Sequence, residues 1–367
     1  HAAAGSYTSP FDNASVLVVD AIGEFTTTSI WNGGHWLSKV WGDIYPRSLG
    51  LFYSAITHRC GLKPNEEEYI LMGMSAYGDP DKYYNEMKPL LDTNLHRGCL
   101  NWLPGVEDYY DFAATAQKIY EEEFEKLVYK TKKMLPRNRN LVIMGGCALN
   151  CVANNLALKY FDDVWIMPAP GDSGSSLGAI LADSEQHVNW KGPYLGHNIE
   201  GEYPVDKLMK ELLQGNMVGV ANGRAEFGPR ALGNRSLFAD PRGSEVKDKV
   251  NAIKRRQEFR PFAPVVMEQH AKSIFNMPVA SSPYMQYVIK CTKPTEYPAI
   301  VHKDGTSRVQ TVNKNQHQGL YRLLSEWYKA TGCPMLLNTS LNIKGKPMVN
   351  TVEDGILFQK EYGIKVT

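Results

Sequence analysis

The first half of the chain twice repeats a short apolar strand, a glycine turn and a helical stretch, and this order restricts the fold more than any other feature. Residues 141–144 form the first strand, and the glycines at 145–146 open a helical stretch. Residues 164–167 form the second strand, which runs through the turn 168–172 into a helix of small residues at 173–182. This alternation is typical of an α/β domain.

Apolar spacing predicts further elements in the same half. Residues 111–134 carry apolar side chains at helical spacing, and Pro136 ends that helix. Residues 15–19 and 25–31 read as strands, and the segment 20–23 between them reads as a hairpin turn.

The second half has a different pattern. Residues 193–203 contain Pro, Gly, His and Asn with little apolar periodicity, so we place the domain boundary there, between domains at 1–195 and 196–367. After it, strand-like and helical segments mix without regular alternation, which indicates an α+β domain. The predicted strands are 217–221, 263–267, 284–291 and 335–337, and the predicted helix is 320–330.

Charge and composition exclude several classes of protein. Lys plus Arg number 40 and Asp plus Glu number 39, so the chain lacks the overall basic excess of a general nucleic-acid binder. No apolar run is long enough for an ordinary membrane helix, and the amino terminus lacks the pattern of a secretory signal. Six cysteines are too few for a disulfide scaffold, and the closest pair, Cys147 and Cys151, is better explained as buried thiols than as a zinc site. We therefore expect a cytoplasmic protein without a membrane or nucleic-acid partner.

Basic residues concentrate after the predicted boundary. From 224 to 260 the chain has ten Lys or Arg against five Asp or Glu, interleaved with Gly and Pro that break a long helix. Glycines allow a ligand close to the backbone, and guanidinium groups bind phosphate oxygens in pairs. We favour a small phosphorylated ligand over two alternatives, a plain surface patch and a nucleic-acid site. Arg308, near a turn, and the polar run 338–342 add weaker signals of the same kind.

The two glycine turns of the first half are candidates for a nucleotide site. Turns such as 145–150 and 170–174 can bind phosphate through backbone N–H groups, although simple helix entry explains each equally well. Asp172 lies in the second turn and Asp20 follows a strand, so the nucleotide site could also hold a metal ion. Spacing alone gives little support for His1 as a further metal ligand.

Together these segments resemble the NodU/CmcH family of O-carbamoyltransferases. The run 223–242 carries the resemblance, and matching pieces occur in family order along the whole chain. The supporting pieces are HAA at 1–3, SPF at 9–11, VDAIGE at 19–24, MGMSAYG at 72–78, GGCALN at 145–150, PGDSG at 170–174, RPFAP at 260–264 and NTSLN at 338–342.

The resemblance implies a fold, a reaction and a set of site residues. It implies an actin-like ATPase domain that transfers a carbamoyl group, followed by a YrdC-like domain that makes carbamoyl-adenylate from carbamoyl phosphate and ATP. The acceptor would be a hydroxyl of a small molecule or glycan. The residues that match the carbamoyl-phosphate site are Arg230, Lys254, Arg260, Arg308 and Ser340, with Arg224 and Asn342 as weaker additions. Those that match the nucleotide site are Gly145, Gly146, Asn150 and Gly171, and those that match the metal site are His1, Asp20 and Asp172. The metal of the transfer domain would be Fe²⁺ or Mn²⁺, with Mg²⁺ accompanying ATP.

The chain departs from the family pattern at its start. Family members carry about a hundred residues and a further histidine before the position of His1, so we expect this chain to be truncated, which puts acceptor transfer in doubt more than adenylate formation. Two rival functions remain, a small-molecule kinase or ATPase of the actin-like class and a tRNA-associated module related to threonylcarbamoylation. The acceptor, the metal and the oligomeric state, for which a homodimer is one option, stay open.

Overall fold

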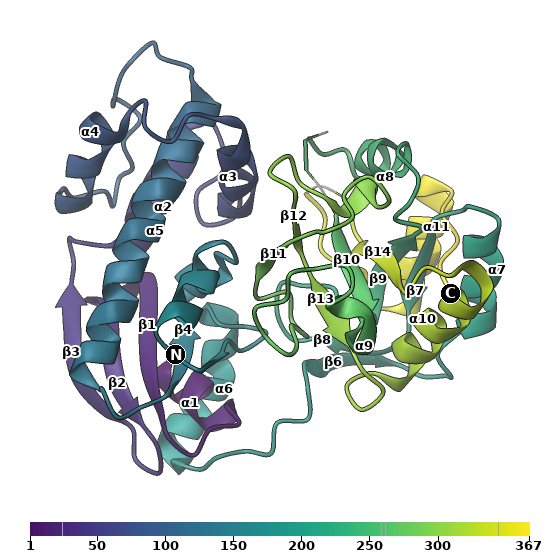
Figure 1. The fold of residues 1–367 in the computed structure, drawn as a ribbon, viewed down its shortest axis with the longest axis horizontal. Coiled ribbons are helices and arrows are strands. Elements are labelled where there is room, and N and C mark those ends of the chain that lie inside the picture. The colour runs from purple at the N-terminus through teal and green to yellow at the C-terminus, as the bar shows by residue number, and fades with distance from the viewer. Residues whose placement is uncertain (24, 258, 261, 344) are drawn as a thin grey trace. The chain divides into compact units, whose positions relative to one another are not determined.

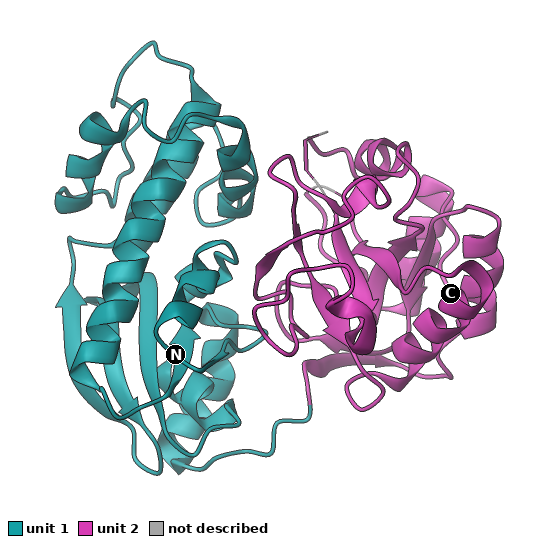
Figure 2. Cartoon of the chain, in the orientation of Figure 1, with its two compact units in different colours: residues 1–191 teal, residues 192–367 magenta. Residues whose placement is uncertain are grey.

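The computed structural model describes residues 1–23, 25–257, 259–260, 262–343 and 345–367 (Figure 1). Glu24 and Pro261, which belong to two of the motifs above, lie outside the described residues. The chain divides into two compact units, unit 1 at residues 1–191 and unit 2 at residues 192–367 (Figure 2). Each is described by itself.

Unit 1 is built on a five-stranded mixed sheet. Its strand order is β3-β2-β1-β4-β5, in which the three strands from the first third of the chain are antiparallel and β1, β4 and β5 are parallel. The strands are β1 (Ala14–Gly23), β2 (Thr26–Gly33), β3 (Ser38–Ile44), β4 (Asn140–Met144) and β5 (Asp163–Trp165). The predicted strands at 15–19, 25–31, 141–144 and 164–167 are thereby confirmed within a few residues.

Helices cover this sheet. The long helix α5 (Tyr109–Met134) confirms the helix predicted from apolar spacing, and it buries Phe112, Ile119 and Phe124. The predicted helix at 173–182 is α6 (Asp172–Ser184), which packs on α1 (Ala2–Thr8). The remaining helices are α2 (Leu49–Arg59), α3 (Glu68–Met74) and α4 (Tyr84–Met87), with the short 3₁₀ turns η1 (Ser75–Tyr77), η2 (Lys88–Asp92), η3 (Gly146–Leu149) and η4 (Ala153–Lys159).

The hairpin turn predicted at 20–23 is wrong. β1 continues through Gly23, and its pairing with β2 shifts register between Val19 and Gly23. The segment therefore forms the last part of β1, with a bulge, and not the turn that joins β1 to β2. A bulge changes the direction of the side chains that it contains, and here it contains Asp20.

Unit 2 contains a second five-stranded sheet, of order β13-β10-β14-β9-β7, and two separate strand pairs, β11–β12 and β6–β8. The predicted strand at 284–291 is confirmed only as the shorter β11, whereas those at 217–221, 263–267 and 335–337 are present. The strands are β6 (Tyr194–Ile199), β7 (Val218–Ala221), β8 (Gly223–Glu226), β9 (Arg235–Ala239), β10 (Ala263–Met267), β11 (Val288–Lys290), β12 (Thr306–Arg308), β13 (Gln310–Val312) and β14 (Met335–Ser340).

The helices of unit 2 include α10 (Gln318–Thr331), which confirms the helix predicted at 320–330 and buries Leu320, Leu324 and Trp327. The others are α7 (Val205–Leu213), α8 (Val246–Lys254), α9 (Glu268–Ala271), the 3₁₀ turn η5 (Pro298–Ile300) and α11 (Val352–Tyr362). In the described part of the chain, no helix combines the length and the apolar character needed to cross a membrane.

Candidate functional site

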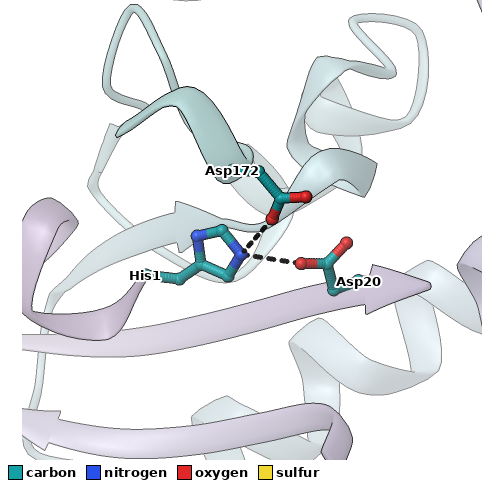
Figure 3. A group of neighbouring side chains, drawn as sticks. All are labelled: His1, Asp20 and Asp172. Atoms are coloured by element: carbon teal, nitrogen blue, oxygen red, sulfur yellow. Dashed lines mark hydrogen bonds and ion pairs between the residues drawn. The ribbon is translucent and has the colours of Figure 1, made fainter. Parts of the chain in front are cut away.

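Unit 1 brings His1, Asp20 and Asp172 together from three separate elements (Figure 3). His1 precedes α1, Asp20 lies in the bulge of β1, and Asp172 begins α6. The His1 Nε2 atom lies 2.7 Å from Asp20 Oδ2 and 3.4 Å from Asp172 Oδ1. Among the described residues, this is the one grouping of at least three His, Cys, Asp or Glu side chains whose ligand atoms all lie within 4.8 Å of one another.

The local electrostatics favour the protonated form of His1 and the ionised form of Asp20. The hydrogen bond to Asp20 raises the pKa of His1, more than burial lowers it. Burial alone would raise the pKa of Asp20, but the hydrogen bonds from His1 and from the Ala21 backbone N–H outweigh burial, and that pKa is lowered. One imidazole and two carboxylates form a donor set that suits Fe²⁺, Mn²⁺ or Mg²⁺. The residues therefore fit a divalent metal ion.

Ser175 is a further member of this cluster that sequence reasoning missed. Its Oγ lies 3.2 Å from His1 Nδ1, the ring nitrogen that does not face the carboxylates. Ser175 follows Asp172 by one turn of α6, so the spacing of three residues was the available signal. A hydrogen bond at the second nitrogen orients an imidazole toward a metal.

The two glycine turns predicted from the sequence meet next to Asp20. Gly145 has φ +90°, and its N–H donates to the Pro170 carbonyl at 2.8 Å. A Cβ atom on Gly171 would lie 3.5 Å from Gly146 Cα, and the Gly146 N–H points to Asp20 Oδ1 at 3.4 Å. The side chain of Asn150, in contrast, is buried and forms two hydrogen bonds with Gln117 of α5.

The Cys147 thiol, which lies in the first glycine turn, is not a reactive group. Cys147 and Cys151 are free and buried, as expected from the sequence. Burial raises the pKa of the Cys147 thiol to about 12, so it stays protonated near neutral pH.

Unit 2 brings Lys254, Ser340 and Asn342 together. Lys254 is the last residue of α8 and is only 4% exposed. Its Nζ donates to Ser340 O at 2.5 Å, to Asn342 O at 3.0 Å and to Asn342 Oδ1 at 3.0 Å, and lies 3.2 Å from Ser340 Oγ. Burial lowers the pKa of Lys254 well below its usual value, and the positive charges of Arg256 and Arg260 lower it further. Lys254 and two arginine cations therefore lie near the polar run that ends β14.

Asn251 organises the segment that carries these cations, and sequence reasoning missed it. Its Oδ1 accepts a hydrogen bond from Arg256 Nε at 2.7 Å, and its Nδ2 donates to the Arg260 carbonyl at 3.2 Å. The Arg256 guanidinium also stacks on the ring of Phe262, with Cζ 3.9 Å from the ring centre. These contacts hold both arginines close to the end of α8.

The other predicted basic residues lie on separate elements. Arg224 is exposed on β8, Arg230 is partly buried in the loop between β8 and β9, and Arg308 ends β12 opposite Val288. The Nε atom of Arg308 is buried without a hydrogen-bond partner.

Arg235, in the same basic run, has a different environment. Its side chain is fully buried, and the two terminal nitrogens donate to five backbone carbonyls. The acceptors are Asn222 O, Gly223 O and Asn234 O for Nη1, and His197 O and Asn350 O for Nη2, at 2.9–3.2 Å. This arginine joins chain segments inside unit 2 and leaves little capacity for a ligand.

Comparisons with known proteins agree with these two units. The family model described as "Carbamoyltransferase N-terminus" matches residues 1–107 and 92–181, and the one described as "Carbamoyltransferase C-terminus" matches residues 209–366. The chain therefore belongs to the carbamoyltransferase family of enzymes.

Individual relatives include nodulation proteins and a cephem O-carbamoyltransferase. The chain is 32% identical to "Nodulation protein NolO" of Bradyrhizobium diazoefficiens, over 97% of this chain and 74% of that protein. It is 39% identical to "Nodulation protein U" of the same organism, over 66% of this chain and 48% of that protein. It is 34% identical to "3'-hydroxymethylcephem-O-carbamoyltransferase" of Amycolatopsis lactamdurans, over 80% of this chain and 62% of that protein. The matches thus span about half to three quarters of these relatives.

Proposed function

We propose that this chain carries out ATP-dependent transfer of a carbamoyl group from carbamoyl phosphate to a hydroxyl acceptor, by way of carbamoyl-adenylate. Unit 2 would be a YrdC-like domain that makes the adenylate, and unit 1 an actin-like domain that transfers its carbamoyl group. The observation that carries the proposal is the buried Lys254 beside Ser340 and Asn342, with Arg256 and Arg260 close by. Such a concentration of cations suits a reaction between two phosphorylated substrates.

The reaction balances in three steps. In the first step, water cleaves carbamoyl phosphate to carbamate and phosphate. The phosphate oxygens, on which charge develops, are bound and stabilised by Arg230, Lys254, Arg260, Arg308 and Ser340. A carbamate oxygen then attacks the α-phosphorus of ATP, with Arg224 and Asn342 as further ligands, and pyrophosphate leaves with its Mg²⁺. Finally, an acceptor hydroxyl attacks the carbonyl carbon of carbamoyl-adenylate, gives up its proton, and AMP leaves.

In unit 1, the adenylate would bind at the turns that contain Gly145, Gly146 and Gly171, with Asn150 behind them. Backbone N–H groups at such turns bind phosphate oxygens. A divalent metal held by His1, Asp20 and Asp172 would neutralise charge on the adenylate phosphate. The acceptor is a hydroxyl compound, as the name of the 3'-hydroxymethylcephem relative indicates for that protein.

Exchange of labelled pyrophosphate into ATP tests the adenylate step. We expect exchange that depends on carbamoyl phosphate, and we expect Arg230→Ala to lower its rate by roughly a hundredfold, the size of effect seen when a donor to a developing charge is removed. Arg242→Ala is the matched control, because Arg242 lies in the same motif but pairs with Asp240 at the surface. The formation of ADP in place of AMP would instead support a kinase or ATPase.

Metal binding tests the site in unit 1. Because Asp20 supplies a carboxylate and orients His1, Asp20→Asn should weaken Mn²⁺ binding, measured by electron paramagnetic resonance, by about tenfold or more. Asp43→Asn is the control, since Asp43 is partly exposed on β3, outside the cluster, and its carboxylate accepts the N–H of Ile44. Equal Mn²⁺ affinity in the wild type and Asp20→Asn would exclude Asp20 as a ligand.

A further inference from the structure

The loop between β8 and β9, residues 227–234, carries Arg230 and is held by an unusual number of side chains. Glu226, the last residue of β8, is only 7% exposed, although it carries a carboxyl group. A single oxygen of this group, Oε1, accepts the N–H of Leu232 at 2.7 Å, of Asn234 at 2.8 Å and of Arg235 at 3.3 Å. The carboxyl group thus links the end of β8 to three backbone N–H groups that follow Arg230 in the chain.

The carbonyls of residues 231–233, in the same loop, accept hydrogen bonds from side chains of other elements. Asn338 of β14 donates to Ala231 O at 3.0 Å, and Gln310 of β13 donates to Leu232 O at 3.0 Å. The Tyr194 hydroxyl also donates to Leu232 O at 3.1 Å, and the Tyr203 hydroxyl donates to Gly233 O at 2.8 Å. The loop is therefore attached to the five-stranded sheet through β13 and β14 and to β6 through Tyr194.

Asn234 adds a link to α10. Its Oδ1 accepts from His317 Nε2 at 2.7 Å, while His317 Nδ1 accepts the Leu320 N–H at 3.0 Å. This pattern places the ring proton on Nε2, and burial lowers the pKa of His317 to about 4, so the ring is neutral near pH 7. Residues 231–235 are therefore held in place by hydrogen bonds to side chains of β8, β13 and β14 and to His317, which precedes α10.

We propose that Glu226 is a positioning residue that holds the loop so that Arg230 is directed at the phosphate group of carbamoyl phosphate. This inference rests on the proposed function, in which Arg230 binds that group. Arg230 lies two residues before Leu232, the first residue that Glu226 binds, and the intervening Ala231 is held through its carbonyl by Asn338, so the backbone that follows Arg230 is fixed within two residues. A guanidinium group that binds phosphate in pairs of hydrogen bonds needs such a fixed backbone, because small displacements are costly.

Other residues cannot substitute for Glu226 in this arrangement. Removal of its side chain would leave three buried N–H groups without an acceptor, and a buried donor without a partner is destabilising. The loop would then gain alternative conformations while its carbonyls stay bound. We expect a selective loss at the phosphate site and not a loss of the whole fold.

The test combines kinetics with cleavage by trypsin, which cuts after Arg230. In Glu226→Ala, the KM for carbamoyl phosphate in the exchange reaction should rise about tenfold or more, while the KM for ATP stays unchanged. Cleavage after Arg230 should become faster, with no change at Arg255, which lies at the end of α8.

Two further variants serve as comparisons. Glu226→Gln keeps one acceptor oxygen, so its KM for carbamoyl phosphate and its cleavage rate should fall between those of Glu226→Ala and the wild type. Glu245→Gln, which changes an exposed glutamate before α8, should match the wild type.

Several results would overturn the inference. One is that Glu226→Ala shows the kinetics and the cleavage rate of the wild type. Another is that both KM values and kcat change in parallel, or that cleavage becomes faster at all sites, since either result would mean a general structural role. If Glu226→Ala does not fold, the same comparison is read from Glu226→Gln. If the wild type shows no exchange that depends on carbamoyl phosphate, the proposed function fails, but trypsin cleavage still decides whether Glu226 orders the loop.

Discussion

Replacement of Arg235 by methionine should lower the free energy of unfolding of unit 2 by about 3–5 kcal/mol, the cost of removing one partner from a buried charged network. Methionine fills part of the space of the arginine but donates no hydrogen bond. Five backbone carbonyls from four chain segments would lose the arginine donor inside the protein. The measurement is chemical denaturation of the wild type and the variant.

Two further variants separate the hydrogen bonds from the charge of Arg235. Arg242→Met removes an arginine of the same motif that lies at the surface, pairs with Asp240 and stacks on Trp327, and it should cost about 1 kcal/mol or less. Arg235→Lys keeps the charge but donates to fewer carbonyls, so its stability should lie between those of the wild type and Arg235→Met. If Arg235→Met were no less stable than Arg242→Met, the buried network would not contribute as described.

The second large effect is expected for Gly145→Ala. Gly145 has φ +90°, and a Cβ atom there would lie 2.1 Å from the Val19 carbonyl oxygen. Backbone strain and overpacking together should cost roughly 2–5 kcal/mol. Because Val19 directly precedes Asp20, a displacement of this strand should also weaken Mn²⁺ binding.

Gly61→Ala is the control for this variant. Gly61 also has a positive φ, of +74°, but a Cβ atom would meet no other atom within 4 Å. It should therefore show the backbone strain alone, about 1–2 kcal/mol, with unchanged Mn²⁺ affinity. If Gly145→Ala and Gly61→Ala lost equal stability and bound Mn²⁺ equally well, the close approach of Gly145 to β1 would have no energetic role.

Much of the secondary structure could be predicted from local patterns. α5 follows from apolar spacing, and α6 follows from a run of small residues after a glycine turn. β4 and β5 follow from short apolar runs before glycine turns, and α10 was also predicted. The segment 20–23 could not be predicted, because Asp, Gly and small residues favour a hairpin turn and a bulge alike. The choice between the two depended on the pairing of β1 with β2, which is a contact between strands.

The positions of Asp172 in a glycine turn and of Asp20 after a strand suggested a metal site, and the resemblance to a family of known proteins added His1 as a ligand. Spacing along the chain gave little support for His1, since the three residues come from a helix start, a strand bulge and a second helix start. Their proximity in unit 1 depends on the packing of α1 against both β1 and α6. Ser175 became visible only once that packing was known.

The basic run shows the same division between sequence and structure. By itself, the sequence determined that cations, glycines and prolines concentrate at 224–260 and that strands and helices flank them, because these properties depend on local composition and periodicity. Only the tertiary structure decided that Arg235 is fully buried among carbonyls, that Lys254 meets Ser340 and Asn342, and that Glu226 closes the Arg230 loop. The physical reason is that burial and hydrogen-bond partners are set by segments distant in the chain, so identical side chains in one motif acquire different roles.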